Sequence, residues 1–268
     1  MGTSLIPKPG SKPGSKQEPK QGRQSAPIVE FIGLPGAGKT TLCTEVARQL
    51  HNGGRSVVRR DEILQRWHQN SMGQKLMQLW PDCSRDWQVL TQILALAAQV
   101  QPLNTTSVLK AATTYVNAKR NTRTASHLPQ TRLLDGGGLQ EATLLLDQGV
   151  LQEAWSVAIS GQNPPLKPLQ SAIEALAGDG TMRVVALTVD VETALDRIHN
   201  RPTHNSRFDA MNPDRAGDIL SASVASLQTI LDVLRALGVP ILEVDSSHPI
   251  EENGRAIAQW IFAGKPQF

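Results

Sequence analysis

A glycine-rich stretch near the start of the chain limits what this sequence can fold into. The apolar run 28–32 is followed by Gly33-Leu34-Pro35-Gly36-Ala37-Gly38-Lys39-Thr40-Thr41, and apolar residues at helical spacing come next. This order predicts a buried strand that leads through a tight loop into an amphipathic helix. The loop, called the P-loop below (residues 33–41), matches the phosphate-binding pattern G-x-x-x-x-G-K-T in the context that the pattern requires.

Each residue type of the P-loop suits the binding of a nucleotide phosphate. The glycines Gly33, Gly36 and Gly38 permit backbone angles at which successive N–H groups converge on one anion, beside a helix N-terminus. We expect Lys39 to reach the β- and γ-phosphates and the Thr40 hydroxyl to bind Mg²⁺. A chance glycine-rich turn is the alternative. All nine residues of the loop are therefore predicted nucleotide ligands.

The first 26 residues form a basic leader. They hold five Lys or Arg and one Glu, a net charge of +4 in a chain of net charge +3, so the remaining residues sum to −1. They repeat Lys-Pro-Gly-Ser at 8–11 and 12–15 and contain few apolar side chains, which predicts disorder. Weak attraction to an anionic partner is the alternative. Because the excess positive charge lies in the leader, we expect no specific nucleic-acid partner.

Length and composition indicate one domain after the leader. The chain has 268 residues, and 40% of them are apolar, enough for a sizeable core. No run of 18 apolar residues occurs, so no membrane span is expected. The two cysteines, Cys43 and Cys83, fit neither a zinc site nor a disulfide scaffold, and the leader lacks a secretory signal. A cytoplasmic location is therefore expected.

A second strand at 55–59 is expected to bring two acids to the P-loop. Ligands of open parallel sheets bind outside the carboxyl ends of the strands, and Asp61 and Glu62 follow this strand directly. Asp61 would hold or deprotonate an acceptor hydroxyl, or cap the next helix, or do both.

Residues 61–126 have a helical pattern with proline breaks and are expected to form an insertion between strands. The stretch 87–100 is strongly apolar, which predicts a buried helix. Arg120 and Arg123 lie near the end of the insertion. We expect them at a solvated helix end, and the alternative is that they face a substrate phosphate.

An aspartate farther along the chain is expected to support the metal. Residues 131–135 form a short apolar run that ends in Asp135 and is followed by three glycines. An apolar strand that ends in Asp is the arrangement in which a carboxylate supports Mg²⁺. We therefore predict a third strand here and a metal site formed by Thr40 and Asp135. A plain strand-to-helix turn is the alternative, and a helical region is expected over 139–177.

A group of arginines follows the expected fourth strand, residues 182–189. Arg197 and Arg201 are four residues apart and would share one helix face, and a polar loop then carries Arg207. Three guanidinium groups on residues 197–213 suit a lid that stabilises the charge on a transferring phosphoryl group. An exposed arginine face paired with nearby acids is the alternative.

This order of features resembles the P-loop kinases of the nucleoside-monophosphate kinase type, such as thymidylate and adenylate kinases. The resemblance implies a three-layer α/β/α P-loop NTPase fold over residues 27–265, with a five-stranded parallel sheet, a helical insertion and a lid segment. It implies ATP and Mg²⁺ as cofactors, Asp135 as the second metal residue, and Arg197 and Arg201 as the lid pair, with Arg201 packed against adenine. The glycines after Asp135 depart from the pattern of thymidylate kinases.

These observations together predict a kinase that transfers the γ-phosphate of ATP to a small-molecule acceptor, nucleoside-like or another hydroxyl or phosphate acceptor. The candidate catalytic residues are Lys39, Asp61, Arg197, Arg201 and Arg207. The alternatives are a switch or adaptor that hydrolyses ATP or GTP without phosphotransfer, and a nucleotide-binding relic with a structural role. The sequence leaves the acceptor unidentified and permits a homodimer.

Overall fold

The computed structural model of the chain describes most residues between 26 and 263. The described residues are 26–71, 73–74, 77, 80–81, 84–100, 105–127, 131–132, 139–140, 142–159, 165–177, 182–201, 208 and 211–263. The predicted disordered leader lies outside them, apart from Ala26.

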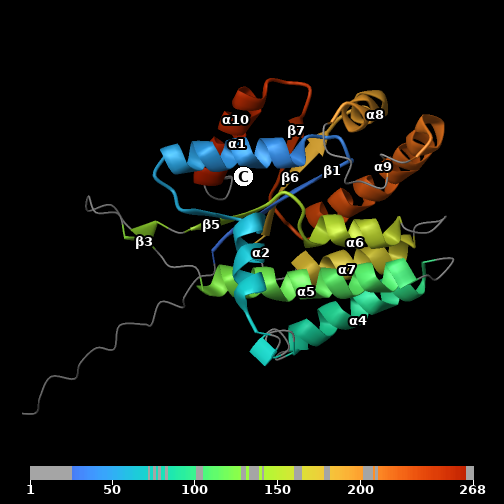
Figure 1. Cartoon of the computed structure of the whole chain (residues 1–268), viewed down its shortest axis with the longest axis horizontal. Helices are drawn as coiled ribbons and strands as arrows, with labels where there is room; N and C mark the ends of the chain where they lie inside the picture. The colour runs from blue at the N-terminus through green and yellow to red at the C-terminus, as the bar shows by residue number, and fades with distance from the viewer. Residues whose placement is uncertain are drawn as a thin grey trace, which may run out of the picture.

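Five parallel strands form the centre of the fold (Figure 1). They are β1 (Ile28–Gly33), β2 (Val57–Arg59), β5 (Thr143–Leu146), β6 (Met182–Thr188) and β7 (Ile241–Asp245), in the order β2-β5-β1-β6-β7. β1 lies in the middle and is buried along its whole length, as its mostly apolar sequence predicts. The predicted five-stranded parallel sheet is confirmed.

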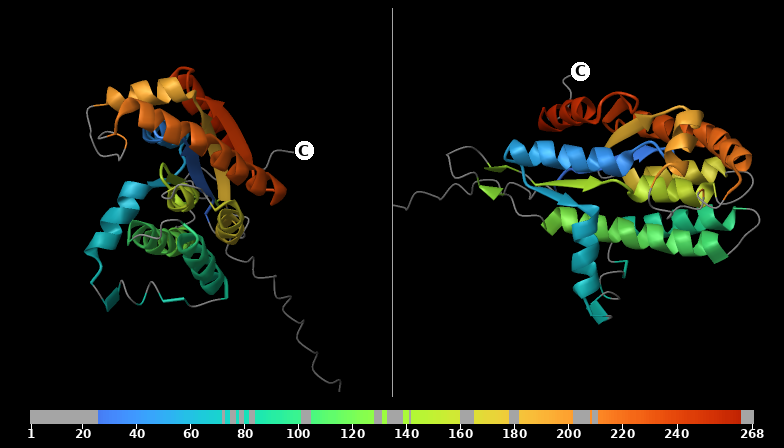
Figure 2. Two further views of the ribbon diagram at one scale, coloured as in Figure 1. Left: turned by 90° about the vertical axis from the view of Figure 1, so that its right-hand side faces the viewer. Right: turned by 45° about the horizontal axis from the view of Figure 1, so that its top comes forward.

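Helices cover both faces of this sheet (Figures 1 and 2). One face carries α1 (Lys39–Asn52) and α10 (Ile250–Phe262), which pack against each other and against Val29 and Phe31 of β1. The other face carries the main core, to which α4 (Ser84–Ala98), α5 (Thr105–His127), α6 (Val150–Ala158), α7 (Leu166–Ala177), α8 (Val191–His199) and α9 (Pro213–Ala236) contribute. The result is the predicted three-layer α/β/α arrangement.

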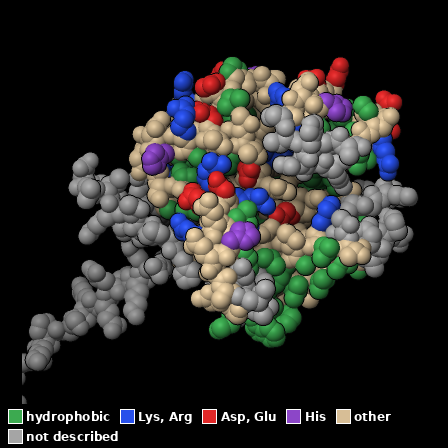
Figure 3. Space-filling view, viewed as in Figure 1, with side chains coloured by type: hydrophobic (Ala, Val, Ile, Leu, Met, Phe, Trp, Pro, Cys, Tyr) green, Lys and Arg blue, Asp and Glu red, His purple; other side chains and the backbone are tan. Residues whose placement is uncertain are grey.

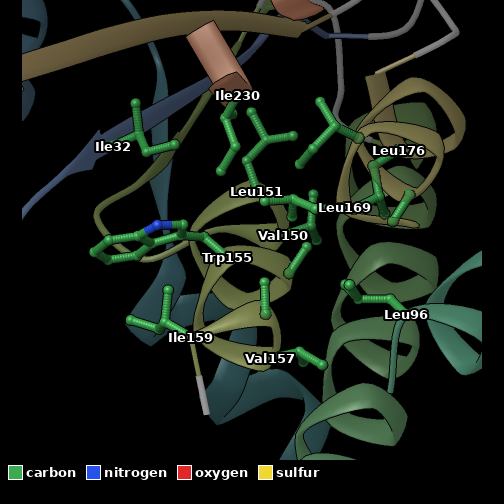
Figure 4. Packing of buried hydrophobic residues seen from close by; sticks show 14 of the residues in the cluster. Ile32, Leu96, Val150, Leu151, Trp155, Val157, Ile159, Leu169, Leu176 and Ile230 are labelled. Carbon is green, nitrogen blue, oxygen red and sulfur yellow. The ribbon is translucent and has the colours of Figure 1, made fainter. Parts of the chain in front are cut away.

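The main core is built around α6, which is buried on nearly every side (Figure 4). Trp155, Leu151, Leu169 and Ile230 are among its fully buried side chains. The Trp155 indole N–H donates to Ser226 Oγ at 2.8 Å, which satisfies the one polar atom of this ring. Because α6 has so little solvent-facing surface, its polar residues must also find buried partners.

The strand predicted to begin at Thr131 is present but does not belong to the main sheet, and residues 133–135 of the prediction lie outside the described residues. β3 (Thr131–Arg132) pairs antiparallel with β4 (Leu139–Gln140) in a separate two-stranded sheet. The main sheet instead uses β5, which lies in the stretch 139–177 that the pattern predicts as helical. A four-residue apolar run is too short for periodicity to separate a buried strand from a buried helix.

An exposed apolar patch covers the outer side of the helical region that follows α2 (Arg60–Gln69). Figure 3 shows apolar side chains gathered there, over α4 and α5. Among the described residues from 70 to 127, the most exposed large apolar side chains are Met77, Trp80, Leu109 and Trp87, which are 79%, 70%, 62% and 50% exposed. Apolar surface of this kind often marks interaction sites, and the homodimer that the sequence permits is not tested by it.

α9 is, among the described helices, the one long and apolar enough to cross a membrane by length and composition, with a mean hydropathy of 1.3. Its Leu220, Ile230 and Leu234 are fully buried in the main core. α9 also packs against α7, another helix of this core. One side of the helix is therefore part of the core, and 39% of its apolar window is buried.

Candidate functional site

The P-loop leaves the carboxyl end of the central strand and enters α1, as the sequence predicts. Gly36 and Gly38 have φ angles of +83° and +82°, which favour glycine. A Cβ at Gly36 would lie 2.3 Å from the carbonyl oxygen of Ala194, so a side chain there would push the loop away from α8. Gly38 is the N-cap of α1. The first N–H groups of α1, which lack helical acceptors, are therefore available to an anion at the loop.

The Lys39 side chain folds back over the P-loop. Its Nζ donates to the carbonyl oxygens of Gly33 at 2.7 Å and Leu34 at 2.9 Å. Burial lowers the pKa of Lys39 to about 8, and the nearby Asp147 carboxylate opposes this shift. An anionic phosphate beside Nζ would raise that pKa again, so phosphate binding and the protonated lysine favour each other.

Asp147 takes the place that the sequence analysis assigned to Asp135. It follows β5 directly, and its Oδ2 accepts a hydrogen bond from Thr40 Oγ1 at 2.8 Å. Asp135 lies outside the described residues, and its role at the metal stays a prediction. The signal for Asp147 was present in the sequence, because Thr143–Leu146 is also an apolar run that ends in Asp.

Thr40 and Asp147 fit a Mg²⁺ ion of the kind that a nucleotide brings with it. Mg²⁺ prefers oxygen ligands and is usually held by one or two protein groups together with phosphates and water. A threonine hydroxyl and a carboxylate, joined at the P-loop, supply two such groups. Within the described parts of the chain, no group of three or more His, Cys, Asp or Glu could hold a metal.

A pocket of about 220 Å³ adjoins the P-loop beside the turn between β7 and α10. Its walls include Ala37, Thr41, Arg197 and Ser246. Arg197 donates from Nη1 to Ser246 Oγ and from Nη2 to the Ser246 carbonyl oxygen, both at 3.0 Å. The position suits the base of a nucleotide whose phosphates lie in the P-loop, and Arg197 forms part of this wall.

The predicted lid lies only partly within the described residues. α8 ends at His199 and Asn200 caps it, so Arg201 lies beyond the helix and does not share a helix face with Arg197. The cause is Pro202, because the residue before a proline avoids the helical conformation. Arg207 lies outside the described residues, and its role stays a prediction.

The acids after β2 are placed at the start of α2. Glu62 Oε1 accepts a hydrogen bond from the backbone N–H of Arg59 at 3.2 Å and so caps the helix. Asp61 is 64% exposed at its side chain, and its Oδ1 lies 3.6 Å from Arg59 Nε. Glu62 therefore caps α2, and the Asp61 side chain remains accessible to a ligand.

A buried polar cluster lies where α2, α5 and α6 meet. Asn117 donates from Nδ2 to Glu153 Oε1, and Arg120 donates from Nη2 to Asn117 Oδ1. Arg60 Nη2 lies 4.0 Å from the same Glu153 oxygen, and the Arg120 guanidinium lies 5.9 Å from the centre of the Trp67 ring. Arg120 is buried, so the expectation of a solvated helix end is wrong for this residue.

The cluster keeps unused hydrogen-bonding capacity. Glu153 Oε2 and Arg120 Nε are buried, and neither has a hydrogen-bond partner among the described residues. Burial raises the pKa of Glu153 to about 7, opposed by Arg60, Asn117 and Arg120. Buried groups that have a perturbed pKa and an unused hydrogen-bonding atom are typical of binding sites. Sequence analysis missed Glu153 because it is the one charged residue of a mostly apolar helix.

A second buried carboxyl group connects the sheet to the P-loop. Glu30, in the middle of β1, is completely buried, and its Oε1 accepts from the backbone N–H of Gln152 at 2.9 Å. Gln152 Oε1 in turn accepts from the backbone N–H of Gly33 at 3.2 Å. Burial raises the pKa of Glu30 to about 8, and the N–H groups at the start of α6 oppose this. A side chain at Gly149 would clash with Glu30 at 2.3 Å.

The parallel sheet, the P-loop and the aspartate at the end of the neighbouring strand together form a P-loop α/β fold. A family model described as an AAA domain matches residues 28–130. No curated protein sequence matches the chain.

Solved structures of deoxyadenosine kinase from M. mycoides are similar in fold. The structure with the products dCMP and dCDP has a TM-score of 0.48 and 13% identity, and the match covers 88% of this chain and 99% of that one. The structure with dATP has a TM-score of 0.46 at 13% identity, with the same coverage.

Proposed function

We propose that this chain is an ATP-dependent kinase that transfers the γ-phosphoryl group to a hydroxyl or phosphate group of a small-molecule acceptor. One observation carries the proposal: two adjacent residues of α6 contact two different sites. Gln152 bonds to the P-loop, and Glu153 belongs to the polar cluster. A donor site and an acceptor site would thus lie side by side on one rigid helix, as phosphoryl transfer requires.

The donor half rests on the P-loop. Its N–H groups and Lys39 would bind the β- and γ-phosphates, and the pocket beside Arg197 would hold the base. Thr40 and Asp147 would hold Mg²⁺, which when bound neutralises the charge on the phosphates. Arg201 and Arg207 keep their predicted role in stabilising the transferring group.

The acceptor half rests on the polar cluster. Glu153 Oε2 would accept a hydrogen bond from the acceptor, and Arg120 Nε would donate one. The Trp67 ring beside Arg120 offers an aromatic surface for a flat acceptor, which fits a nucleoside-like molecule. In the transfer step, the acceptor oxygen forms a bond to the γ-phosphorus and the bond to the β,γ-bridging oxygen breaks. For a hydroxyl acceptor, the proton leaves to a carboxylate at the mouth of the site, for which we propose Asp61.

A phosphotransfer screen tests this function. The full chain is incubated with γ-labelled ATP, Mg²⁺ and nucleosides, nucleoside monophosphates, sugars or amino alcohols in turn. We expect label on at least one acceptor class and none with a Lys39→Ala variant. Label that appears only as free phosphate would overturn the proposal in favour of an ATP-hydrolysing switch.

A further inference from the structure

A second cavity, of about 120 Å³, lies between the sheet and helices α4, α5 and α7. Its apolar wall includes Ile28 and Met182 from the starts of two strands, with Val89 of α4 and Val150 of α6. It shares no lining residue with the pocket beside the P-loop. Of its wall residues, Leu146 directly precedes Asp147 in the sequence and Val150 follows it by three residues.

One polar group on the cavity wall lacks a partner. The Asn121 side chain is 5% exposed and lines the cavity, and its Oδ1 has no hydrogen-bond partner among the described residues. A buried carbonyl oxygen without a donor destabilises a fold. The cavity therefore offers a hydrogen-bond acceptor that a donor group of a bound molecule would satisfy.

The charged side chains of the wall, in contrast, have partners. Lys119 donates to Asp86, and Lys119 itself is 5% exposed. Arg85 Nη2 donates to the Leu176 carbonyl oxygen at 3.2 Å. Lys119 and Asp86 neutralise each other and Arg85 is hydrogen-bonded to the backbone, so the cavity suits an uncharged ligand.

The size and lining of the cavity favour an organic molecule over water alone. A volume of about 120 Å³ accommodates roughly ten water-sized groups. Ordered water needs two to four polar partners for each molecule, and a mainly apolar wall does not supply them. A single ring molecule of roughly ten non-hydrogen atoms fills the same space with apolar contacts.

We propose that this cavity is a second small-molecule site, which binds a compact, uncharged ring compound whose N–H or O–H group donates to Asn121 Oδ1. The ligand contacts Leu146 and Val150 on both sides of Asp147. The site is independent of the proposed kinase function, because it is defined by contacts outside the P-loop and the polar cluster.

Titration of the full chain with two matched probes, indole and indene, tests the proposal. The two have similar bicyclic shapes, and only indole carries an N–H group. We expect indole to bind about tenfold more tightly than indene, as one additional buried hydrogen bond implies. Equal affinity, no measurable binding, or displacement of indole by ADP would overturn the proposal.

Two variants locate the binding. Asn121→Leu removes the acceptor oxygen and should make the two affinities equal by weakening indole alone. Ala118→Phe fills the cavity from α5 and should abolish binding of both probes, while thermal unfolding reports whether each variant folds. If one variant does not fold, the other still tests the proposal. Unchanged binding of the probes in either folded variant would mean that they bind outside the cavity.

Discussion

The Gln152 side chain joins the first residue of the P-loop to α6, since its Oε1 accepts the backbone N–H of Gly33 at 3.2 Å. Gln152 is itself held through its own N–H by Glu30, which lies in the middle of the central strand. The P-loop is therefore connected to the sheet in two ways, through the backbone that continues from β1 and through the hydrogen bonds of Gln152.

Replacing Gln152 tests this anchor. Gln152→Leu should weaken ADP binding about tenfold, because the Gly33 N–H loses its acceptor and the loop loses its fixed position. Gln152→Glu keeps an acceptor oxygen and should retain most of the affinity. Gln170→Leu, which removes an exposed glutamine that bonds to Glu174, serves as the control. Equal ADP affinities for the leucine variant and the wild type in calorimetry would refute the anchoring role.

Glu30 makes stability depend on pH. Its pKa is raised from 4.5 to about 8, so the unfolded chain loses this proton first and stability falls as pH rises between these values. The Glu30→Gln variant has no titrating group at this position. Between pH 5 and pH 8, the free energy of unfolding of the wild type should therefore fall by up to a few kcal/mol relative to that of the variant. Urea unfolding of both proteins at several pH values measures this difference. Glu153 titrates in an overlapping window and its charge helps to raise the pKa of Glu30, so the comparison is repeated in a Glu153→Gln background. A pH-independent difference in both backgrounds would contradict the assignment.

Substitutions of Asp147 and Asp135 should affect Mg²⁺ binding differently. Asp147→Asn should raise the Mg²⁺ concentration needed for half-maximal ATP binding about tenfold or more, because a neutral amide is a poor ligand of Mg²⁺. Asp135→Asn is the matched variant and should leave this concentration unchanged if the Thr40–Asp147 pair is the metal site. The reverse pattern would restore the assignment made from sequence.

Lys39→Ala should abolish ATP binding, since no other side chain of the P-loop carries a positive charge. Fluorescence titration with a labelled nucleotide measures the affinity of the variant and of the wild type. Retained micromolar affinity in the variant would refute the P-loop as the phosphate site.

The sequence predicted the donor half of the site more fully than the acceptor half. Residues 33–41 are recognisable because glycine positions and one lysine are fixed by the geometry of phosphate binding. Asp147 was missed because two short apolar runs that end in Asp lie close together, and only the pairing of β5 with β1 distinguishes them. Glu153 lies on α6, whereas Asn117 and Arg120 lie on α5, so their meeting depends on tertiary packing that no local pattern encodes.

The partition of label from γ-labelled ATP between acceptor and free phosphate tests the central claim most directly. The wild type should place label on an acceptor, and Arg120→Gln should lower acceptor labelling at least about tenfold while ADP affinity stays the same. Such a result would assign the polar cluster to the acceptor and the P-loop to the donor. Wild-type label found only in free phosphate, across all acceptor classes, would contradict the account.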